Sequence, residues 1–207
     1  ENVFNVGCPS IDALLSIKDD PSCLKKFSLT SPFYLVLQHP VTTEYDKAIE
    51  QMKETIKAIN RLEEDVLIIL PNNDAGYYKM ISEVKKTNHK IINSLGLDDF
   101  VNLLKRSEGL IGNSSSGIHE TNTFNIPTIN IGTRQNNRSS SNSIINIDCN
   151  KIKILNSITK TLKKEIIKSS FNKEFEFGSG NSDKNFLKIL NKKSFWKTSH
   201  QKFFQDL

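Results

Sequence analysis

The sequence predicts an α/β protein built on a Rossmann-like, doubly wound parallel sheet. Short apolar runs alternate with helix-length amphipathic segments over the first 150 residues, and this alternation is typical of parallel strands joined by crossover helices. The turn-forming residues Gly, Pro, Asn and Ser follow the apolar runs directly, at the strand ends where such sheets bind ligands. A chain of 207 residues with 37% hydrophobic residues can bury a full core.

Six short apolar runs are predicted as strands: residues 33–38, 66–70, 90–92, 110–112, 128–131 and 144–147. Four amphipathic segments between them are predicted as helices: residues 43–61, 75–86, 98–106 and 116–124. Asp74 and Ser116 are candidate N-caps for the second and fourth of these helices. We expect residues 1–150 to form the sheet domain, and residues 151–207 to form Lys-rich helices that pack on the sheet and toward a domain upstream.

Polar or glycine-containing segments follow five of the predicted strands. In strand order they are residues 39–40, 71–76, 95–96, 113–117 and 132–135. The carboxyl ends of parallel strands lie at one edge of a sheet, so these segments predict a ligand site along that edge.

The segment from Leu110 to Glu120 indicates a buried strand that runs into a helix N-terminus. Its Ser and Gly residues would let a phosphate approach the backbone, whose free N–H groups would point at the phosphate. Glu120 would repel a bare phosphate and fits the neutral hydroxyls of a ribose better, so the segment predicts a nucleotide diphosphate. The alternative is an ordinary cap in which Ser116 accepts a hydrogen bond from its own helix, although Glu120 lies one position beyond the capping-box site.

Two more side chains at strand ends fit a diphosphate. Arg134 follows the fifth strand, where its guanidinium could bind phosphate oxygens in a bidentate manner. His39 follows the first strand and could donate to the diphosphate and stabilise a leaving group. The alternatives are a surface arginine in a polar loop and a structural histidine.

The composition argues against several kinds of partner. The net charge of +5 comes from lysines in residues 151–207, and without arginines they predict a solvated helix face and no nucleic-acid partner. No run reaches the roughly 18 apolar residues of a membrane span, and the four histidines are too scattered to predict a metal site. Three cysteines without paired spacing predict reduced thiols in a cytoplasmic protein, and we expect Cys8 and Cys149 to be buried.

Six motifs in sequence order resemble those of a known family. They are GCPSID at residues 7–12, HPVTT at 39–43, PNNDAG at 71–76, IGNSSSGIHE at 111–120, GTRQ at 132–135 and FGSGN at 177–181. Together they resemble the UDP-N-acetylglucosamine 2-epimerase family, specifically its hydrolysing branch, which makes free N-acetylmannosamine or a related sugar for sialic-acid-type biosynthesis. The resemblance implies a glycosyltransferase-B type fold, of which this chain would be the C-terminal half, in a homo-oligomeric protein with a further N-terminal domain.

The resemblance also implies roles for residues at the predicted edge. Ser114 and Ser115 would hold the diphosphate, Arg134 would bind the phosphates, Glu120 would bind the ribose hydroxyls, and His39 would contact the diphosphate near the chemistry.

The base would lie beside three more residues of the chain. Asn72, the backbone of Leu95 and the ring of Phe100 would surround the nucleotide, with Leu95 and Phe100 against uracil.

The chemistry that the resemblance implies is loss of the proton at sugar C2 and loss of UDP, followed by addition of water with inversion at C2. The catalytic carboxylates would come from the N-terminal domain, and no metal or redox cofactor would be needed. Feedback-regulated animal relatives carry arginines where this chain has Ser82 and Lys85, so control by an activated sialic acid is not expected. Ser179 stands where the family usually has an acid.

Two other functions remain open from the sequence. The chain could be the donor-binding domain of a UDP-sugar glycosyltransferase, which shares the fold but transfers the sugar to an acceptor. It could also be a nucleotide-binding module without catalysis.

Overall fold

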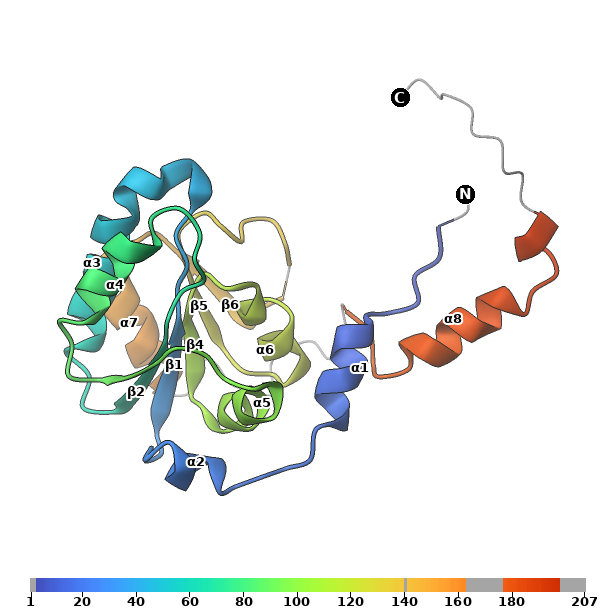
Figure 1. Cartoon of the computed structure of the whole chain (residues 1–207), viewed down its shortest axis with the longest axis horizontal. Helices are drawn as coiled ribbons and strands as arrows, with labels where there is room; N and C mark the ends of the chain where they lie inside the picture. The colour runs from blue at the N-terminus through green and yellow to red at the C-terminus, as the bar shows by residue number, and fades with distance from the viewer. Residues whose placement is uncertain (1–2, 140, 163–176, 198–207) are drawn as a thin grey trace. The chain divides into compact units, whose positions relative to one another are not determined.

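Six parallel strands form one sheet in the computed structural model (Figure 1). The strands are β1 Phe33–Leu37, β2 Asp65–Ile69, β3 Lys90–Ile92, β4 Gly109–Gly112, β5 Thr128–Ile131 and β6 Ile144–Ile147. Their spatial order is β3-β2-β1-β4-β5-β6, and every neighbouring pair is parallel. Because this is the strand order of a Rossmann fold, the predicted doubly wound sheet is confirmed, with each strand end within one residue of its predicted position.

The structure describes residues 3–139, 141–162 and 177–197. They divide into two compact units, with boundaries after residue 16 and after residue 174. Helix α7 (Lys151–Leu162), the first helix after the boundary that the sequence predicts at residue 150, packs on the sheet of the larger unit. No helix in the described ranges has the length and apolar character needed to cross a membrane.

Helices α3 (Ala48–Ile59), α4 (Tyr77–Val84) and α7 cover one face of the sheet (Figure 1). Their apolar side chains pack against strand residues that include Tyr34, Val36 and Ile111. Alternate residues of a strand point to the same face, so the remaining residues of β1 must be buried on the opposite side.

The opposite face is covered by α2 (Cys23–Lys26), α5 (Leu97–Arg106) and α6 (Glu120–Thr123). Phe33 and Leu35 of β1 pack here against leucines of α5. A strand with both faces buried must be apolar at every position, which explains why the first predicted strand is an uninterrupted apolar run.

Two predicted helices begin later than expected. Residues 42–47 form the 3-10 helix η1, and α3 starts only at Ala48 because Glu44 has the non-helical angles φ −133° and ψ 29°. Helix α4 starts at Tyr77 after Gly76, which is left-handed with φ 98°. Asp74 is therefore not the N-cap of α4, and that prediction is wrong.

Residues 116–124 do not form the continuous helix that was predicted. The 3-10 turn η2 (Ser115–Gly117) is followed by the four-residue helix α6. The cap of η2 is Ser114, whose Oγ accepts a hydrogen bond from the Ser116 N–H at 3.3 Å, so Ser116 is not the cap. A Cβ at Gly117 would come within 2.7 Å of the Thr128 side chain, so this turn packs directly on β5.

The smaller unit contains α1 (Pro9–Ser16), α8 (Ser182–Leu190) and the 3-10 helix η4 (Phe195–Lys197). The Asp12 carboxylate accepts hydrogen bonds from the backbone N–H and hydroxyl of Ser182, at 2.8 and 2.6 Å. The GCPSID and FGSGN motifs therefore pack against each other, since the Cys8 N–H also donates to the carbonyl of residue 177 at 2.9 Å.

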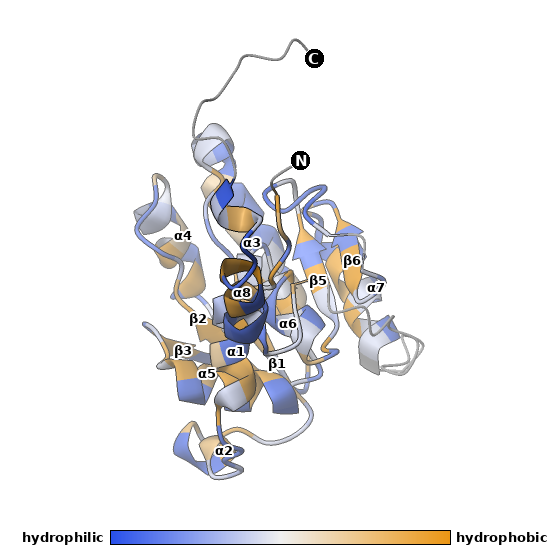
Figure 2. Cartoon of the chain, turned by 90° about the vertical axis from the view of Figure 1, so that its right-hand side faces the viewer, coloured by the Kyte–Doolittle hydropathy of each residue, from blue (hydrophilic) through white to orange (hydrophobic). Residues whose placement is uncertain are grey.

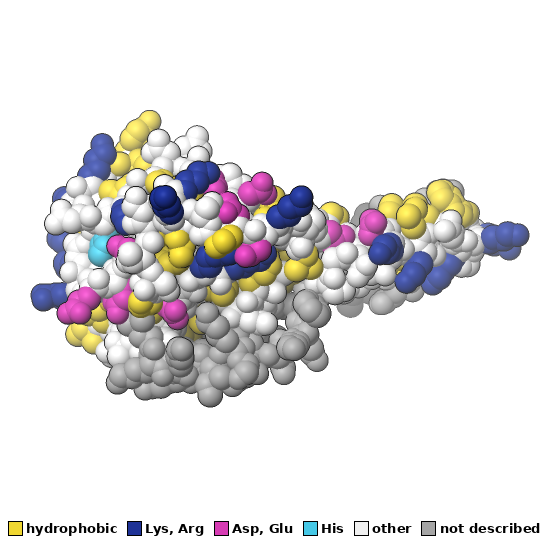
Figure 3. All heavy atoms as spheres, turned by 90° about the horizontal axis from the view of Figure 1, so that it is seen from below, with side chains coloured by type: hydrophobic (Ala, Val, Ile, Leu, Met, Phe, Trp, Pro, Cys, Tyr) yellow, Lys and Arg dark blue, Asp and Glu magenta, His cyan; other side chains and the backbone are white. Residues whose placement is uncertain are grey.

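Helix α8 carries both hydrophobic and hydrophilic residues (Figure 2). Phe186, Leu187 and Trp196 are more than half exposed, at 53%, 55% and 67%. Figure 3 shows hydrophobic side chains and lysines next to one another on the surface of this unit.

All three cysteines are free thiols. Cys23 is buried, whereas Cys8 and Cys149 are only half-buried, so the expectation that these two are buried is wrong. The Cys149 thiol lies 3.2 Å from the Gln51 carbonyl oxygen, and burial raises its pKa to about 12.

Candidate functional site

The carboxyl ends of β1 and β4 meet at the centre of the sheet. These neighbouring strands stand where the strand order reverses direction, which is the switch point at which Rossmann-like sheets bind ligands. Two cavities are lined by the loops at this edge, with volumes of about 440 and 490 Å³. We call the first the arginine cavity and the second the apolar cavity, after the side chains that line them.

Gly112 and Asn113, at the end of β4, contact the end of β1 and the loop that follows it. Gly112 has φ +142°, and a Cβ on it would clash with the carbonyl group of Leu37 in β1. Asn113 is buried, and its amide group pairs with both backbone groups of His39: Oδ1 accepts from the N–H at 2.7 Å and Nδ2 donates to the carbonyl at 2.9 Å. Asn113, directly after β4, therefore fixes the backbone of His39, two residues after the end of β1.

His39 is held as a neutral hydrogen-bond donor. The Asn72 backbone N–H donates to Nδ1 at 3.2 Å, so in the neutral ring the proton is on Nε2, which can donate to a ligand. Burial lowers the pKa of His39 below its ordinary 6.5, and the nearby positive charge of Arg134 lowers this pKa further. At neutral pH the ring is therefore mostly uncharged, and its Nε2–H is available to donate to a ligand.

The lowered pKa of His39 predicts how stability depends on pH. Because the folded pKa lies below 6.5, the unfolded chain takes up this proton more readily, and stability falls as the pH drops below 6.5 toward the folded value. We expect the His39→Asn variant, which cannot titrate there, to lose less stability than the wild type between about pH 7.5 and pH 5. Urea unfolding at the two pH values measures this difference, and equal losses would contradict the assignment.

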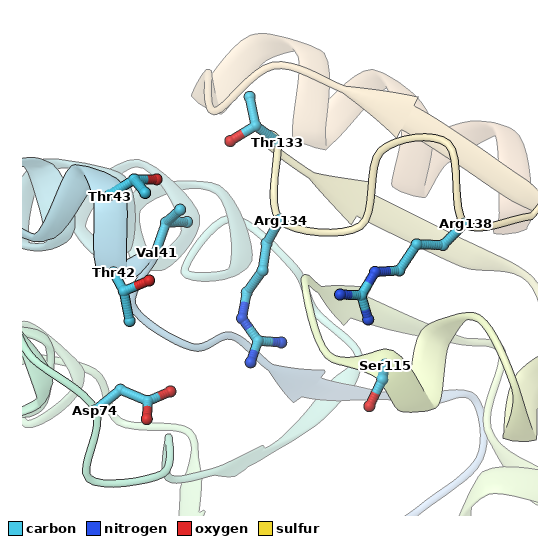
Figure 4. Close-up of a pocket in the computed structure, with 8 residues that line it drawn as sticks. All are labelled: Val41, Thr42, Thr43, Asp74, Ser115, Thr133, Arg134 and Arg138. Atoms are coloured by element: carbon cyan, nitrogen blue, oxygen red, sulfur yellow. The ribbon is translucent and has the colours of Figure 1, made fainter. Parts of the chain in front are cut away.

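The serine turn η2 lies between the two cavities. Ser115 lines the arginine cavity and Ser116 lines the apolar cavity. Ser114 is buried with 6% of its surface exposed, and it lines neither cavity because its hydroxyl caps the turn. The serines thus have different positions, and Ser115 is the one that lines the same cavity as the arginines (Figure 4).

Two arginines point into the arginine cavity from the loop that follows β5 (Figure 4). The Arg134 guanidinium donates to the Asn113 carbonyl at 3.1 Å, and Gln135 donates to the same oxygen at 2.9 Å. Asp74 lies on the opposite wall. Within the described residues neither Arg134 nor Arg138 forms an ion pair, so both retain charge for an anion.

The apolar cavity brings together five of the residues predicted for the nucleotide: His39, Asn72, Leu95, Phe100 and Glu120. Leucine and isoleucine side chains from the ends of β1 and β2 complete its wall. The Glu120 Oε2 atom is buried and has no hydrogen-bond partner among the described residues. A buried carboxylate oxygen without a donor is costly, and hydroxyl donors of a ligand would satisfy it.

The structure thus places seven of the eight predicted site residues on two adjacent cavities, and Ser114 beneath them. Sequence reasoning missed Asn113 as the residue that orders His39, and Arg138 as a second arginine of the site. A second arginine in the same strand-end loop was the available signal for Arg138. In the described ranges no three His, Cys, Asp or Glu side chains are grouped as a metal site would require.

Comparison with known proteins identifies close similarity to one family. The family model described as "UDP-N-acetylglucosamine 2-epimerase" matches residues 1–191. A protein of that name from Neisseria meningitidis serogroup B is 29% identical over 221 aligned positions, covering 100% of this chain and 56% of that protein. A "UDP-N,N'-diacetylbacillosamine 2-epimerase (hydrolyzing)" from Legionella pneumophila is 31% identical, covering 82% of this chain and 47% of that protein.

Solved structures agree on the fold. The structure of the Methanocaldococcus jannaschii UDP-GlcNAc 2-epimerase in complex with UDP-GlcNAc and UDP has a TM-score of 0.71 at 19% identity, covering 90% of this chain and 54% of that one. Proteins of this kind have a glycosyltransferase-B type fold. The chain spans about half the length of the relatives that it matches. It belongs to the UDP-N-acetylglucosamine 2-epimerase family.

Proposed function

We propose that this chain is the nucleotide-sugar-binding, C-terminal half of a hydrolysing 2-epimerase that acts on UDP-N-acetylglucosamine or a related UDP-2-acetamido sugar. The observation that carries the proposal is the pairing of an apolar cavity with an arginine cavity at the switch point, separated by the serine turn. A nucleoside diphosphate has the same division, with a flat, largely apolar base at one end and two charged phosphates at the other.

The apolar cavity takes the nucleoside in this proposal. The Phe100 ring and Leu95 offer apolar contact to the base, and Glu120 accepts hydrogen bonds from the two ribose hydroxyls. The buried, unpartnered Glu120 Oε2 supports this placement, because a ribose supplies the donors that the chain does not.

The serine turn and the arginine cavity take the diphosphate. Ser115 and Arg134 contact the phosphate oxygens in this proposal. His39 lines the apolar cavity together with Ser116 of the serine turn, and its Nε2–H donates across the turn to the oxygen that becomes the leaving group. The positive charge of Arg134 and the neutral donor His39 support this role, since preorganised donors and charges stabilise an anion as it develops.

The proposed reaction has two steps. A base removes the proton at sugar C2, the C1–O bond breaks with its electron pair leaving on the β-phosphate oxygen, and a C1=C2 double bond forms. Water then adds its hydroxyl group to C1 and a proton returns to C2 from the opposite face, which gives UDP and the free C2-inverted sugar. The base and acid belong to a further domain in this proposal, as the coverage of about half of each relative supports.

The reaction type, the location and the oligomeric state are supported by separate observations. The hydrolysing reaction is supported by the relatives from Legionella pneumophila and Campylobacter jejuni whose names specify it. A cytoplasmic location is supported by the three free thiols. A homo-oligomeric whole protein remains part of the proposal from the family resemblance.

Incubating UDP-N-acetylglucosamine with the full-length protein tests the reaction. We expect UDP and a free 2-acetamido sugar to appear in equal amounts without any acceptor, and the 207-residue chain alone to bind UDP with little turnover. Sugar that appears only joined to an acceptor would instead identify a glycosyltransferase. UDP binding without turnover by the full-length protein would identify a binding module, and substantial turnover by this chain alone would refute the proposed division of labour.

A further inference from the structure

Arg138 is an exposed arginine whose side chain the backbone turns into the arginine cavity (Figure 4). Two successive turn hydrogen bonds shape the loop: Asn136 N–H to the Thr133 carbonyl at 3.1 Å, and Arg138 N–H to the Gln135 carbonyl at 3.4 Å. Asn137 is left-handed with φ 61°, a conformation that asparagine tolerates better than most residues. The loop therefore returns to the cavity wall at Arg138.

The two arginines share this cavity with Asp74, and within the described residues neither of them forms an ion pair. Arg134 is anchored to the Asn113 carbonyl at 3.1 Å, and Arg138 has neither an ion pair nor a side-chain hydrogen bond in the described part of the chain. Like charges that face one cavity repel each other, and an anion with two charged groups would relieve that repulsion.

The order of the two cavities places the β-phosphate in the cavity that both arginines line. The serine turn separates the apolar cavity, which holds Glu120, from the arginine cavity. A ribose at Glu120 therefore brings the α-phosphate to the serine turn and sends the β-phosphate into the arginine cavity. Arg134 is the half-buried, anchored arginine, and Arg138 is the exposed one.

We propose that Arg138 binds the β-phosphate of UDP and the UDP-sugar, and so distinguishes a nucleoside diphosphate from a monophosphate. This proposal rests on the proposed function, because it assumes that UDP occupies the site. In the elimination step the electron pair of the broken C1–O bond stays on a β-phosphate oxygen, and the Arg138 guanidinium pairs with the charge that this oxygen gains.

Isothermal calorimetry with UDP and UMP tests the role of Arg138. We expect Arg138→Ala to weaken UDP binding by about tenfold, the size of one exposed charge-assisted contact, and to leave UMP binding within about twofold of the wild type. Arg138→Lys should restore part of the UDP affinity, because lysine keeps the positive charge but lacks the bidentate hydrogen-bond geometry of the guanidinium. Arg61→Ala is the matched control, since Arg61 is also exposed and lines neither cavity.

The possible outcomes separate the two proposals. A wild-type chain that does not bind UDP overturns the proposed function. A wild-type chain that binds UDP, with an Arg138→Ala variant that keeps the same ratio of UDP to UMP affinity, overturns the role of Arg138 alone. A variant that binds UDP and UMP more weakly by the same factor also overturns the role of Arg138. An unchanged thermal midpoint of unfolding in each variant shows that a loss of affinity does not come from a loss of folding.

Discussion

Replacing Gly112 with alanine is expected to lower the free energy of unfolding by roughly 2 to 5 kcal/mol. A Cβ at Gly112 would clash with the carbonyl oxygen of Leu37 and lie 2.5 Å from its carbonyl carbon, and the residue has φ +142°. The Leu37 carbonyl group and the φ angle of Gly112 both belong to the backbone of the paired strands β1 and β4, in which Leu37 is opposite Gly112. Neither strand can move away without breaking the pairing that forms the centre of the sheet.

Urea unfolding monitored by circular dichroism measures the effect of Gly112→Ala. The matched control is Gly96→Ala, because Gly96 has φ −66° and a Cβ there would meet no heavy atom within 4 Å. We expect this control to stay within about 1 kcal/mol of the wild type. If Gly112→Ala is no less stable than Gly96→Ala, the close approach of the two strands is wrong.

Replacing Arg134 with alanine is expected to weaken UDP binding by roughly 1.5 to 3 kcal/mol, or about 10- to 150-fold. The Arg134 guanidinium is half-buried, is anchored to the Asn113 carbonyl at 3.1 Å and carries no ion pair within the described residues. Partial burial reduces screening by water and salt, so the loss should exceed that of the exposed Arg138.

Calorimetry with UDP measures the contribution of Arg134, again with Arg61→Ala as the control. Arg134→Lys should recover only part of the affinity, because lysine cannot reproduce the bidentate geometry of the guanidinium. Removing Arg134 also removes a positive charge that lowers the pKa of His39, so this pKa should rise in the variant. An Arg134→Ala chain with wild-type affinity would remove Arg134 from the site.

The strands and the ligand-binding edge were predictable from the sequence for one physical reason. A parallel strand buried on both faces must be apolar throughout, so its ends are marked by the first polar residue, as Leu37 and the following Gln38 show in β1. Because carboxyl ends share an edge, the polar residues after these runs had to lie together.

The serine turn was harder to predict because its conformation depends on distant residues. Thr121 and Thr123 are poor helix formers, and Gly117 packs against Thr128 of the neighbouring strand. Local capping chemistry identified a serine cap but placed it at Ser116, two residues after the real one.

The division into units and the position of Arg138 also depend on features that local patterns do not encode. Asp12 contacts Ser182, which lies 170 positions further along the chain. Arg138 lines the cavity directly after Asn137, which adopts a left-handed conformation that the sequence permits but does not dictate.

A crystal structure of this chain with UDP tests the central claim most directly. We expect uracil and ribose in the apolar cavity, with Glu120 accepting from the ribose hydroxyls, and the diphosphate between Ser115, Arg134 and the Nε2 of His39. UDP bound elsewhere on the chain, or in these cavities with Glu120 turned away from the ribose, would contradict it.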